Sequence, residues 1–189
     1  MTTIYFIRHA EPNYENHDDS VRELSKKGLR DRKLVTEFLL DKNIDAVLSS
    51  PYRRAVDTVS DFAETVGLDV LLIDGFKERW IAGEWIEDFA SFCRKQWSDF
   101  KYKLPDGESL EEVQMRNILA LERVLELYAG KNIVVGSHGT ALSTIINYYD
   151  NSFGHAEFEN IKGLMPWIVK FVFDEKTLVS IHKYDLFAK

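Results

Sequence analysis

Residues 4–11 read Ile-Tyr-Phe-Ile-Arg-His-Ala-Glu, an apolar run that ends in a basic pair. The run Ile4–Ile7 consists of β-branched and aromatic residues, which predicts a short buried strand. Arg8 and His9 follow directly at the carboxyl end of that strand. Because ligands of open α/β sheets bind beyond the carboxyl ends of the strands, this stretch places two chemically capable side chains where a site is expected.

Strand and helix patterns alternate along the rest of the chain. Apolar runs predict further strands at 46–48, 70–73 and 133–135, and a terminal hairpin of 167–173 and 178–181. Apolar residues at helical spacing predict helices that begin after Ser25, at Pro51, at Glu108 and at Gly139. Such alternation predicts an α/β fold, a three-layer α/β/α sandwich whose mostly parallel sheet is made mixed by the hairpin. We expect residues 1–189 to form a single domain.

Composition and charge exclude several classes of protein. Of the 189 residues 45% are apolar and 13% aromatic, which is incompatible with a disordered chain. The net charge of −7 argues against a nucleic-acid partner, and the single cysteine, Cys93, cannot form an internal disulfide. The apolar run at the N-terminus is too short for a signal peptide, and nothing approaches the roughly 18 apolar residues of a membrane span. We therefore expect a cytoplasmic protein with no membrane partner.

Aromatic residues concentrate in one segment. Residues 76–102 are a seventh of the chain and hold a third of its aromatic residues: Phe76, Trp80, Trp85, Phe89, Phe92, Trp97, Phe100 and Tyr102. One interpretation is a helical insertion, at about 75–106, that packs its own small core. The other is a cap whose aromatic walls cover a pocket for an organic substrate, and the two are compatible.

Two more basic motifs follow predicted strands. The second strand is followed by Arg53 and Arg54. The fourth is followed by His138, which directly precedes a helix that starts at Gly139. Arginine forks match phosphate oxygens and a helix N-terminus adds backbone donors, so these strand ends predict a phosphate site. A metal is not expected, because metal-binding histidines must be neutral and lie near carboxylates rather than cations. Histidine can also be the nucleophile that accepts a phosphoryl group.

These motifs together resemble the histidine phosphatase superfamily, which is also called phosphoglycerate mutase-like. The resemblance covers nearly the whole chain, with the motifs in the order of the family. The matching segments are Arg8–Glu11, Leu24–Gly28, Ser49–Ala55, Phe76–Arg79, Gly107–Ser109 and Ser137–Thr140.

The resemblance implies a role for each matching side chain. His9 matches the nucleophile that becomes phosphohistidine, and Arg8 matches an arginine that holds the phosphoryl oxygens. Arg54 matches the second such arginine; Arg53 does not, because the family's arginine directly precedes the alanine of the motif. His138 matches the histidine that stabilises the transferring group. Members of the superfamily need no metal, so no cofactor is expected.

Glu78 matches the acid that protonates the leaving oxygen and then helps water to attack. The family usually has three residues between this acid and a following glycine, whereas four separate Glu78 from Gly83. This spacing leaves Glu84 as the alternative acid.

The chain departs from the family pattern at two further positions. Ala10 stands where the family has glycine, which would cost on the order of 1 kcal/mol if the backbone there needed a positive φ. Glu15 stands where relatives often have a polar residue that helps to bind phosphate. We expect Asn13 or Asn16 to substitute for it.

The sequence therefore predicts a metal-independent phosphatase that acts on a small-molecule phosphate ester through phosphohistidine. One alternative is a phosphoglycerate mutase, although mutases of the family are typically longer. Another is a non-catalytic module that keeps only the phosphate pocket. A protein phosphohistidine phosphatase is less consistent with the sequence, because such relatives are smaller and lack a substantial cap.

Overall fold

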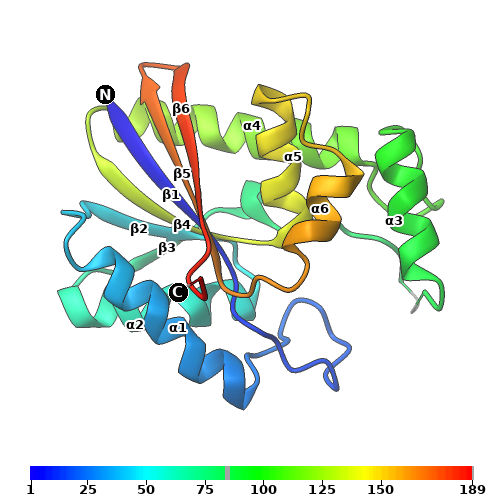
Figure 1. The fold of residues 1–189 in the computed structure, drawn as a ribbon, viewed down its shortest axis with the longest axis horizontal. Coiled ribbons are helices and arrows are strands. Elements are labelled where there is room, and N and C mark those ends of the chain that lie inside the picture. Colours follow the sequence, from blue (N-terminus) through cyan, green and yellow to red (C-terminus); the bar gives the residue numbers. More distant parts are fainter. Residues whose placement is uncertain (84–85, 189) are drawn as a thin grey trace.

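The computed structural model describes residues 1–83 and 86–188 (Figure 1). Its strands form one six-stranded sheet in the order β3-β2-β4-β1-β5-β6. Their bounds are β1 Thr2–Arg8, β2 Ala46–Ser49, β3 Val70–Leu72, β4 Asn132–Ser137, β5 Trp167–Asp174 and β6 Thr177–Tyr184. Strands β3, β2, β4 and β1 pair in parallel, whereas β5 and β6 add antiparallel pairs. The predicted mixed, mostly parallel sheet with a terminal hairpin is confirmed.

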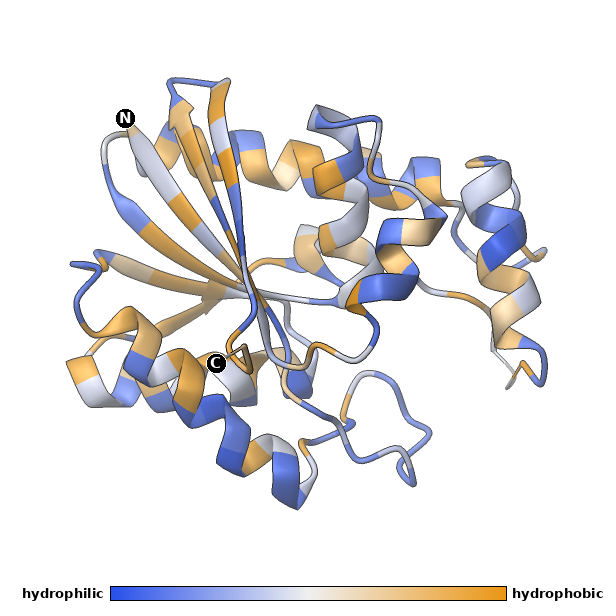
Figure 2. Ribbon diagram, viewed as in Figure 1, coloured by the Kyte–Doolittle hydropathy of each residue, from blue (hydrophilic) through white to orange (hydrophobic). Residues whose placement is uncertain are grey.

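Helices cover both faces of this sheet, which confirms the three-layer prediction (Figure 1). Helices α1 (Lys26–Leu39) and α2 (Arg53–Val66) lie on one face, and α4 (Leu110–Leu127) and α5 (Gly139–Tyr149) lie on the other. The alternation along β1 shows why two covers are needed. Tyr5 and Ile7 pack with α1 and α2, whereas Ile4 and Phe6 pack with α4 and α5. In Figure 2 the helices carry both polar and apolar residues, as helices with one buried side do.

The predicted start of the first helix is confirmed. The Ser25 side chain accepts a hydrogen bond from the Gly28 amide at 3.0 Å, as an N-cap does. The second helix begins later than predicted, at Arg53, with Tyr52 as its N-cap residue. Pro51 therefore lies in the turn between β2 and α2 rather than in the helix.

Helix α4 also begins later than predicted. Ser109 is its N-cap, and the Ser109 and Glu112 side chains each accept a hydrogen bond from the other's backbone amide. This reciprocal capping box fixes the start of the helix at Leu110. Glu108 consequently stays outside the helix and is free to contact the preceding loop.

The aromatic segment packs against the main core. Phe76, in a short 3-10 helix η1 (Asp74–Phe76), is fully buried with its ring centroid 5.6 Å from that of Phe6. Trp97, in α3 (Phe89–Ser98), contacts the rings of Phe100, Phe153 and Phe158.

The interpretation of a separate small core in this segment is therefore wrong. Phe158 belongs to α6 (His155–Ile161), a short helix that the sequence pattern did not predict, and α6 joins α3 to the main apolar cluster. Trp80 and Phe89 remain exposed, and Trp85 lies outside the described residues.

None of the helices in residues 1–83 and 86–188 combines the length and the apolar character that crossing a bilayer requires.

Replacing Trp97 should destabilise the protein. The side chain is 9% exposed, and Trp97→Ala removes its contacts between α3 and α6, so the free energy of unfolding should fall by about 3 kcal/mol. Met115→Ala is the control, because Met115 is 61% exposed on α4 and should change stability by less than about 0.5 kcal/mol. Urea denaturation measures both. Equal small effects would contradict the packing of α3 described above.

Candidate active site

Parallel pairing of β1 with β4 brings the two predicted catalytic histidines together. The register places Arg8 opposite Ser137, so His9 and His138 leave the sheet at the same edge. The His9 amide donates a hydrogen bond to the Ser137 carbonyl at 3.0 Å. The two imidazole rings lie edge to face with centroids 5.4 Å apart. Both side chains are buried.

A backbone carbonyl beside His9 determines which nitrogen of the neutral ring carries the proton. His9 Nδ1 lies 2.8 Å from the Ala10 carbonyl oxygen. A carbonyl only accepts hydrogen bonds, so in the neutral ring the proton is on Nδ1 and the lone pair is on Nε2. The Ala10 amide donates to Thr58 Oγ1 at 2.9 Å, which ties this turn to α2. The arrangement leaves the lone pair of the neutral ring on Nε2.

His138 receives its partner from the end of β2. Its Nε2 lies 2.7 Å from Ser50 Oγ. The Ser50 hydroxyl oxygen also accepts a hydrogen bond from the Tyr52 amide at 3.3 Å, and it keeps one proton and one lone pair for His138. Nδ1 of His138 is buried and has no hydrogen-bond partner among the described residues. Three strand ends thus contribute to one site.

The Arg8 side chain reaches the last residue of α6 and the loop that follows it. Its Nη1 donates to the carbonyl oxygens of Ile161 and Leu164. Its buried Nε finds no partner in the described part of the chain. A Cβ on Gly139 would lie 3.1 Å from that Nε, so glycine at this position lets the guanidinium approach the start of α5.

Arg54 and Arg53 point to different environments. The Arg54 side chain is 3% exposed, lies over the Tyr52 ring and contacts Asp19 through the backbone carbonyl and the carboxylate. The Arg53 side chain is 58% exposed and pairs with Asp57 within its own helix. The burial of Arg54 agrees with the register that the motif implied.

Burial keeps both histidines neutral. It lowers the pKa of His9 well below the ordinary value, and the positive charges of Arg54 and Arg8 lower it further. The pKa of His138 is lowered well below its ordinary value by burial, then by Arg54 and His9. Burial also lowers the pKa of Arg8, while the charge of Glu78 opposes that shift.

Glu78 lies at the N-terminus of α5. Its carboxylate accepts hydrogen bonds from the amides of Thr140 and Ala141, each at 3.0 Å, and from the Arg79 amide at 2.8 Å. Helix N-termini favour negative charge, which accounts for this position. The predicted backbone donors after Gly139 are therefore partly taken by a carboxylate of the protein itself.

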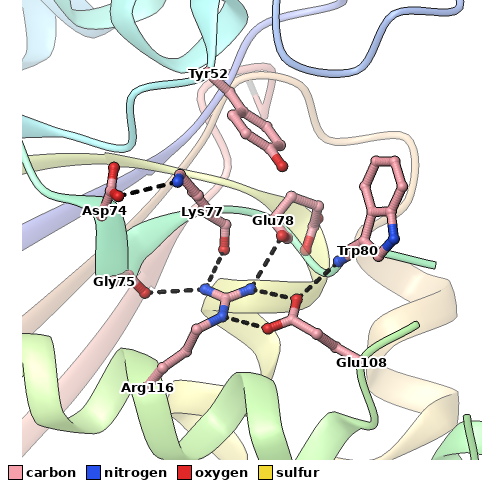
Figure 3. A pocket seen from close by; sticks show the side chains of 8 residues that line it. All are labelled: Tyr52, Asp74, Gly75, Lys77, Glu78, Trp80, Glu108 and Arg116. Atoms are coloured by element: carbon pink, nitrogen blue, oxygen red, sulfur yellow. Dashed lines mark hydrogen bonds and ion pairs between the residues drawn. The ribbon is translucent and has the colours of Figure 1, made fainter. Parts of the chain in front are cut away.

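A cavity of about 410 Å³ adjoins these side chains (Figure 3). Its lining residues are Tyr52, Asp74, Gly75, Lys77, Glu78, Trp80, Glu108 and Arg116. Two of these residues lie next to His138. The Tyr52 ring centroid is 5.4 Å from that of His138, and the Glu78 carboxylate accepts a hydrogen bond from Thr140, at the start of the helix that follows His138. The cavity therefore opens beside the Glu78 carboxylate.

Residues 4–181 match the family model of the histidine phosphatase superfamily, branch 1. The chain belongs to this superfamily. The chain is 27% identical over 153 residues to a Bacillus subtilis protein named uncharacterized phosphatase PhoE, covering 77% of this chain and 76% of that one. It is 26% identical over 171 residues to a probable phosphoglycerate mutase, GpmB, of Yersinia pestis, covering 83% and 79%.

A solved structure also resembles the histidine phosphatase fold of this chain. It is the phosphoserine phosphatase of Entamoeba histolytica in complex with 3-phosphoglyceric acid, with a TM-score of 0.77 and 22% identity. The alignment covers 100% of each chain. At this identity the likeness establishes the shared fold.

The two asparagines predicted to bind phosphate already have partners. The side-chain amides of Asn13 and Asn16 donate to the Glu23 carboxylate at 2.7 and 2.8 Å. These hydrogen bonds lower the pKa of Glu23 to about 2. One N–H of each side-chain amide is thus occupied by Glu23, and the negative charge of that carboxylate would repel a phosphate placed beside it.

The structure answers one of the questions raised by departures from the family pattern. Positive φ angles at residues other than glycine occur in the described chain at Asn43 and Glu175, so Ala10 does not need the conformation that favours glycine. Glu84, the alternative acid, lies outside the described residues.

Sequence reasoning assigned no role to three side chains at the site. Ser50 and Tyr52 stand in the quoted motif after β2, and their position after a strand end was the available signal. Asp19 lies in a polar loop that carries no such signal, yet its carboxylate is 3.1 Å from Arg54 Nη2. Among residues 1–83 and 86–188, His, Cys, Asp and Glu side chains nowhere gather in threes as a metal ion would require.

The two histidines should remain neutral well below pH 6.5, their ordinary pKa. Because a lowered pKa means that a proton binds only at lower pH, both rings of the free protein should keep neutral nitrogen chemical shifts as pH falls through 6.5. Arg54→Met should raise both pKa values, since it removes a positive neighbour. Imidazole NMR titration measures this, with His9→Asn to assign the signals. Titration of His9 at or above 6.5 would contradict the burial argument.

Proposed function

We propose that the protein is a metal-independent phosphomonoester hydrolase that transfers the phosphoryl group of a small organic phosphate to His9 and then to water. The observation that carries the proposal is the buried, neutral His9, whose Nδ1 is bonded to the Ala10 carbonyl and whose Nε2 is left with its lone pair. Arg8 and Arg54, which act on the His9 pKa as neighbouring positive charges, supply the complementary charge. Similarity to proteins named phosphatases supports the same reaction class.

In the first step, His9 Nε2 attacks phosphorus and the bond from phosphorus to the ester oxygen breaks. Arg8 and Arg54 neutralise the charge on the phosphoryl oxygens, which is the main requirement of phosphoryl transfer. We assign the Ser50 hydroxyl as the donor to His138 Nε2, 2.7 Å away, which puts the proton of the neutral His138 ring on Nδ1. We assign that N–H as a further donor to the phosphoryl group.

Glu78 serves both half-reactions as acid and then as base. To act as the acid, the Glu78 carboxyl must first take up a proton, which it then gives to the departing alkoxide, so that an alcohol leaves. Water then attacks the phosphohistidine, its proton passes to the Glu78 carboxylate, and the bond between phosphorus and His9 breaks. Inorganic phosphate leaves and Glu78 is again protonated.

The cavity beside Glu78 is the proposed site of the leaving group. We propose that the segment at about 75–106 acts as its cap within a single domain. Tyr52 and Trp80 provide aromatic walls, and Trp80 is 43% exposed. The cations that line it are already paired, Lys77 with Asp74 at 3.1 Å and Arg116 with Glu108 at 2.7 Å.

This charge balance favours leaving groups with a planar or apolar part over those with a second anionic group. It also argues against phosphoglycerate mutase, whose substrate carries a carboxylate. The mutase remains the second candidate because of the similarity to a probable phosphoglycerate mutase.

The first experiment is phosphate release in EDTA from p-nitrophenyl phosphate and a panel of phosphate esters. Wild type should release phosphate, and His9→Ala should lose at least about 1,000-fold in kcat/KM, because the nucleophile is gone. Brief incubation with labelled substrate should trap an acid-labile phosphoenzyme in wild type alone. A His9→Ala protein that keeps more than about a tenth of the activity would rule out the covalent route. Interconversion of phosphoglycerates with a bisphosphoglycerate primer, without phosphate release, would identify a mutase instead.

Arg54 and Arg53 form a matched pair of variants. Arg54→Ala should reduce kcat/KM by at least about 100-fold, since it removes a buried phosphate-binding fork. Arg53→Ala should stay within about threefold of wild type, because Arg53 forms an exposed pair with Asp57. Steady-state kinetics with one phosphate ester measures kcat/KM for both variants. Equal losses would show that the motif had been aligned one residue out of register.

A further inference from the structure

Arg116 holds the loop that carries Glu78. From α4 its Nη1 donates to the carbonyl oxygens of Gly75 and Lys77 at 3.0 and 2.7 Å, and its Nη2 donates to that of Glu78 at 3.0 Å (Figure 3). The loop from Lys77 to the start of α3 has no regular secondary structure among the described residues. A single guanidinium therefore supplies hydrogen bonds that a strand or helix would otherwise provide.

Glu108 binds both Arg116 and the part of the loop that follows Glu78. Its carboxylate binds Arg116 through two bonds, Nε to Oε1 at 2.7 Å and Nη2 to Oε2 at 2.9 Å. Oε2 also accepts from the Trp80 amide at 2.8 Å, and the Glu108 amide donates to the Trp80 carbonyl at 2.7 Å. Gly107 permits this approach, because a Cβ there would lie 2.1 Å from the Ile81 carbonyl oxygen.

The backbone is thus fixed both before and after Glu78. Gly75 and Lys77 precede it, and Trp80 follows it. Its carboxylate is then aimed at the amides of Thr140 and Ala141. The same network keeps Glu108 ionised: burial alone raises the pKa of Glu108, but hydrogen bonds from Arg116 and the Trp80 amide outweigh burial and hold it below the ordinary value.

We propose that Arg116, with Glu108, is a positioning residue for the reaction: it holds Glu78 where its carboxyl can protonate the leaving oxygen. This inference rests on the proposed function. Proton transfer needs a donor within hydrogen-bond reach of the leaving oxygen, and a shift of about 1 Å in a reacting group can cost about 100-fold in rate. Loss of Arg116 should therefore harm the step that Glu78 serves and spare the others.

Leaving groups separate this effect from a general loss of structure. An alkyl phosphate needs its leaving oxygen protonated, whereas p-nitrophenyl phosphate releases a phenolate that is stable without a proton. Arg116→Met should lower kcat/KM for an alkyl phosphate by about 100-fold and for p-nitrophenyl phosphate by less than about fivefold. The parameter kcat/KM is used because it reports the first phosphoryl transfer. Equal losses on both substrates, or no loss on either, would overturn the proposal.

Arg123→Met is the matched control. Arg123 lies on the same helix and forms an exposed pair with Glu126, so its replacement should leave both kcat/KM values unchanged. If Arg116→Met fails to fold, as judged by near-ultraviolet circular dichroism, Glu108→Gln replaces it. That variant weakens the paired contact and keeps the three bonds to carbonyl oxygens, and it should lower kcat/KM for the alkyl phosphate selectively.

A double-mutant cycle tests whether Arg116 acts through Glu78. In a Glu78→Gln background, Arg116→Met should cost less than about threefold more on the alkyl phosphate, because the proton donor is already lost. Multiplying losses would show that Arg116 acts independently and would overturn the proposal. If the alkyl phosphate reaction is insensitive to Glu78→Gln itself, the role of Glu78 in the proposed function fails. If it is sensitive to Glu78→Gln and insensitive to Arg116→Met, only the present inference fails.

Discussion

The parallel pairing of β1 with β4 is the constraint on which the site depends. Opposing Arg8 to Ser137 makes both strands end at one edge of the sheet, so His9 and His138 emerge side by side. A shift of one residue would reverse which side chains of β1 face each helical layer, and Ile4 and Phe6 would exchange layers with Tyr5. Packing of the β1 side chains in the two apolar layers therefore stabilises the β1–β4 register that places His9 beside His138.

Burying this much charge beside two imidazoles has a chemical consequence. A buried cation is costly unless polar groups surround it, and Arg8 and Arg54 meet this requirement with backbone carbonyls and the Asp19 carboxylate. The two histidines avoid the cost of a buried charge because burial lowers their pKa values and keeps the rings neutral. A neutral ring whose proton is on Nδ1 has its lone pair on Nε2, and a cationic surrounding suits a dianionic phosphate. The same electrostatics thus suits both the proposed nucleophile, His9, and the proposed phosphate substrate.

Much of the fold was predictable because its signals are local. Strand β1 and the cap of α1 at Ser25 depend on nearest neighbours, and both were located from the sequence. Helix α6 was missed because seven residues offer too little periodicity, and its place depends on packing against Trp97. The interpretation of the aromatic segment as a separate core was also wrong because it ignored distant residues. Helix α3 packs against α6, which lies more than 50 residues further along the chain.

The sequence by itself determined the α/β class and the family and named the candidate reactive residues, since strand periodicity and short motifs are local properties of the chain. Only the tertiary structure decided which of these groups are available. It buried Arg54 and exposed Arg53, paired Asn13 and Asn16 with Glu23, and put the Glu78 carboxylate on the first amides of α5. The hydrogen bonds from Arg116 to the loop that carries Glu78 were likewise visible only in the tertiary structure. Burial and hydrogen-bond partners depend on residues far apart in the sequence, and no local pattern records them.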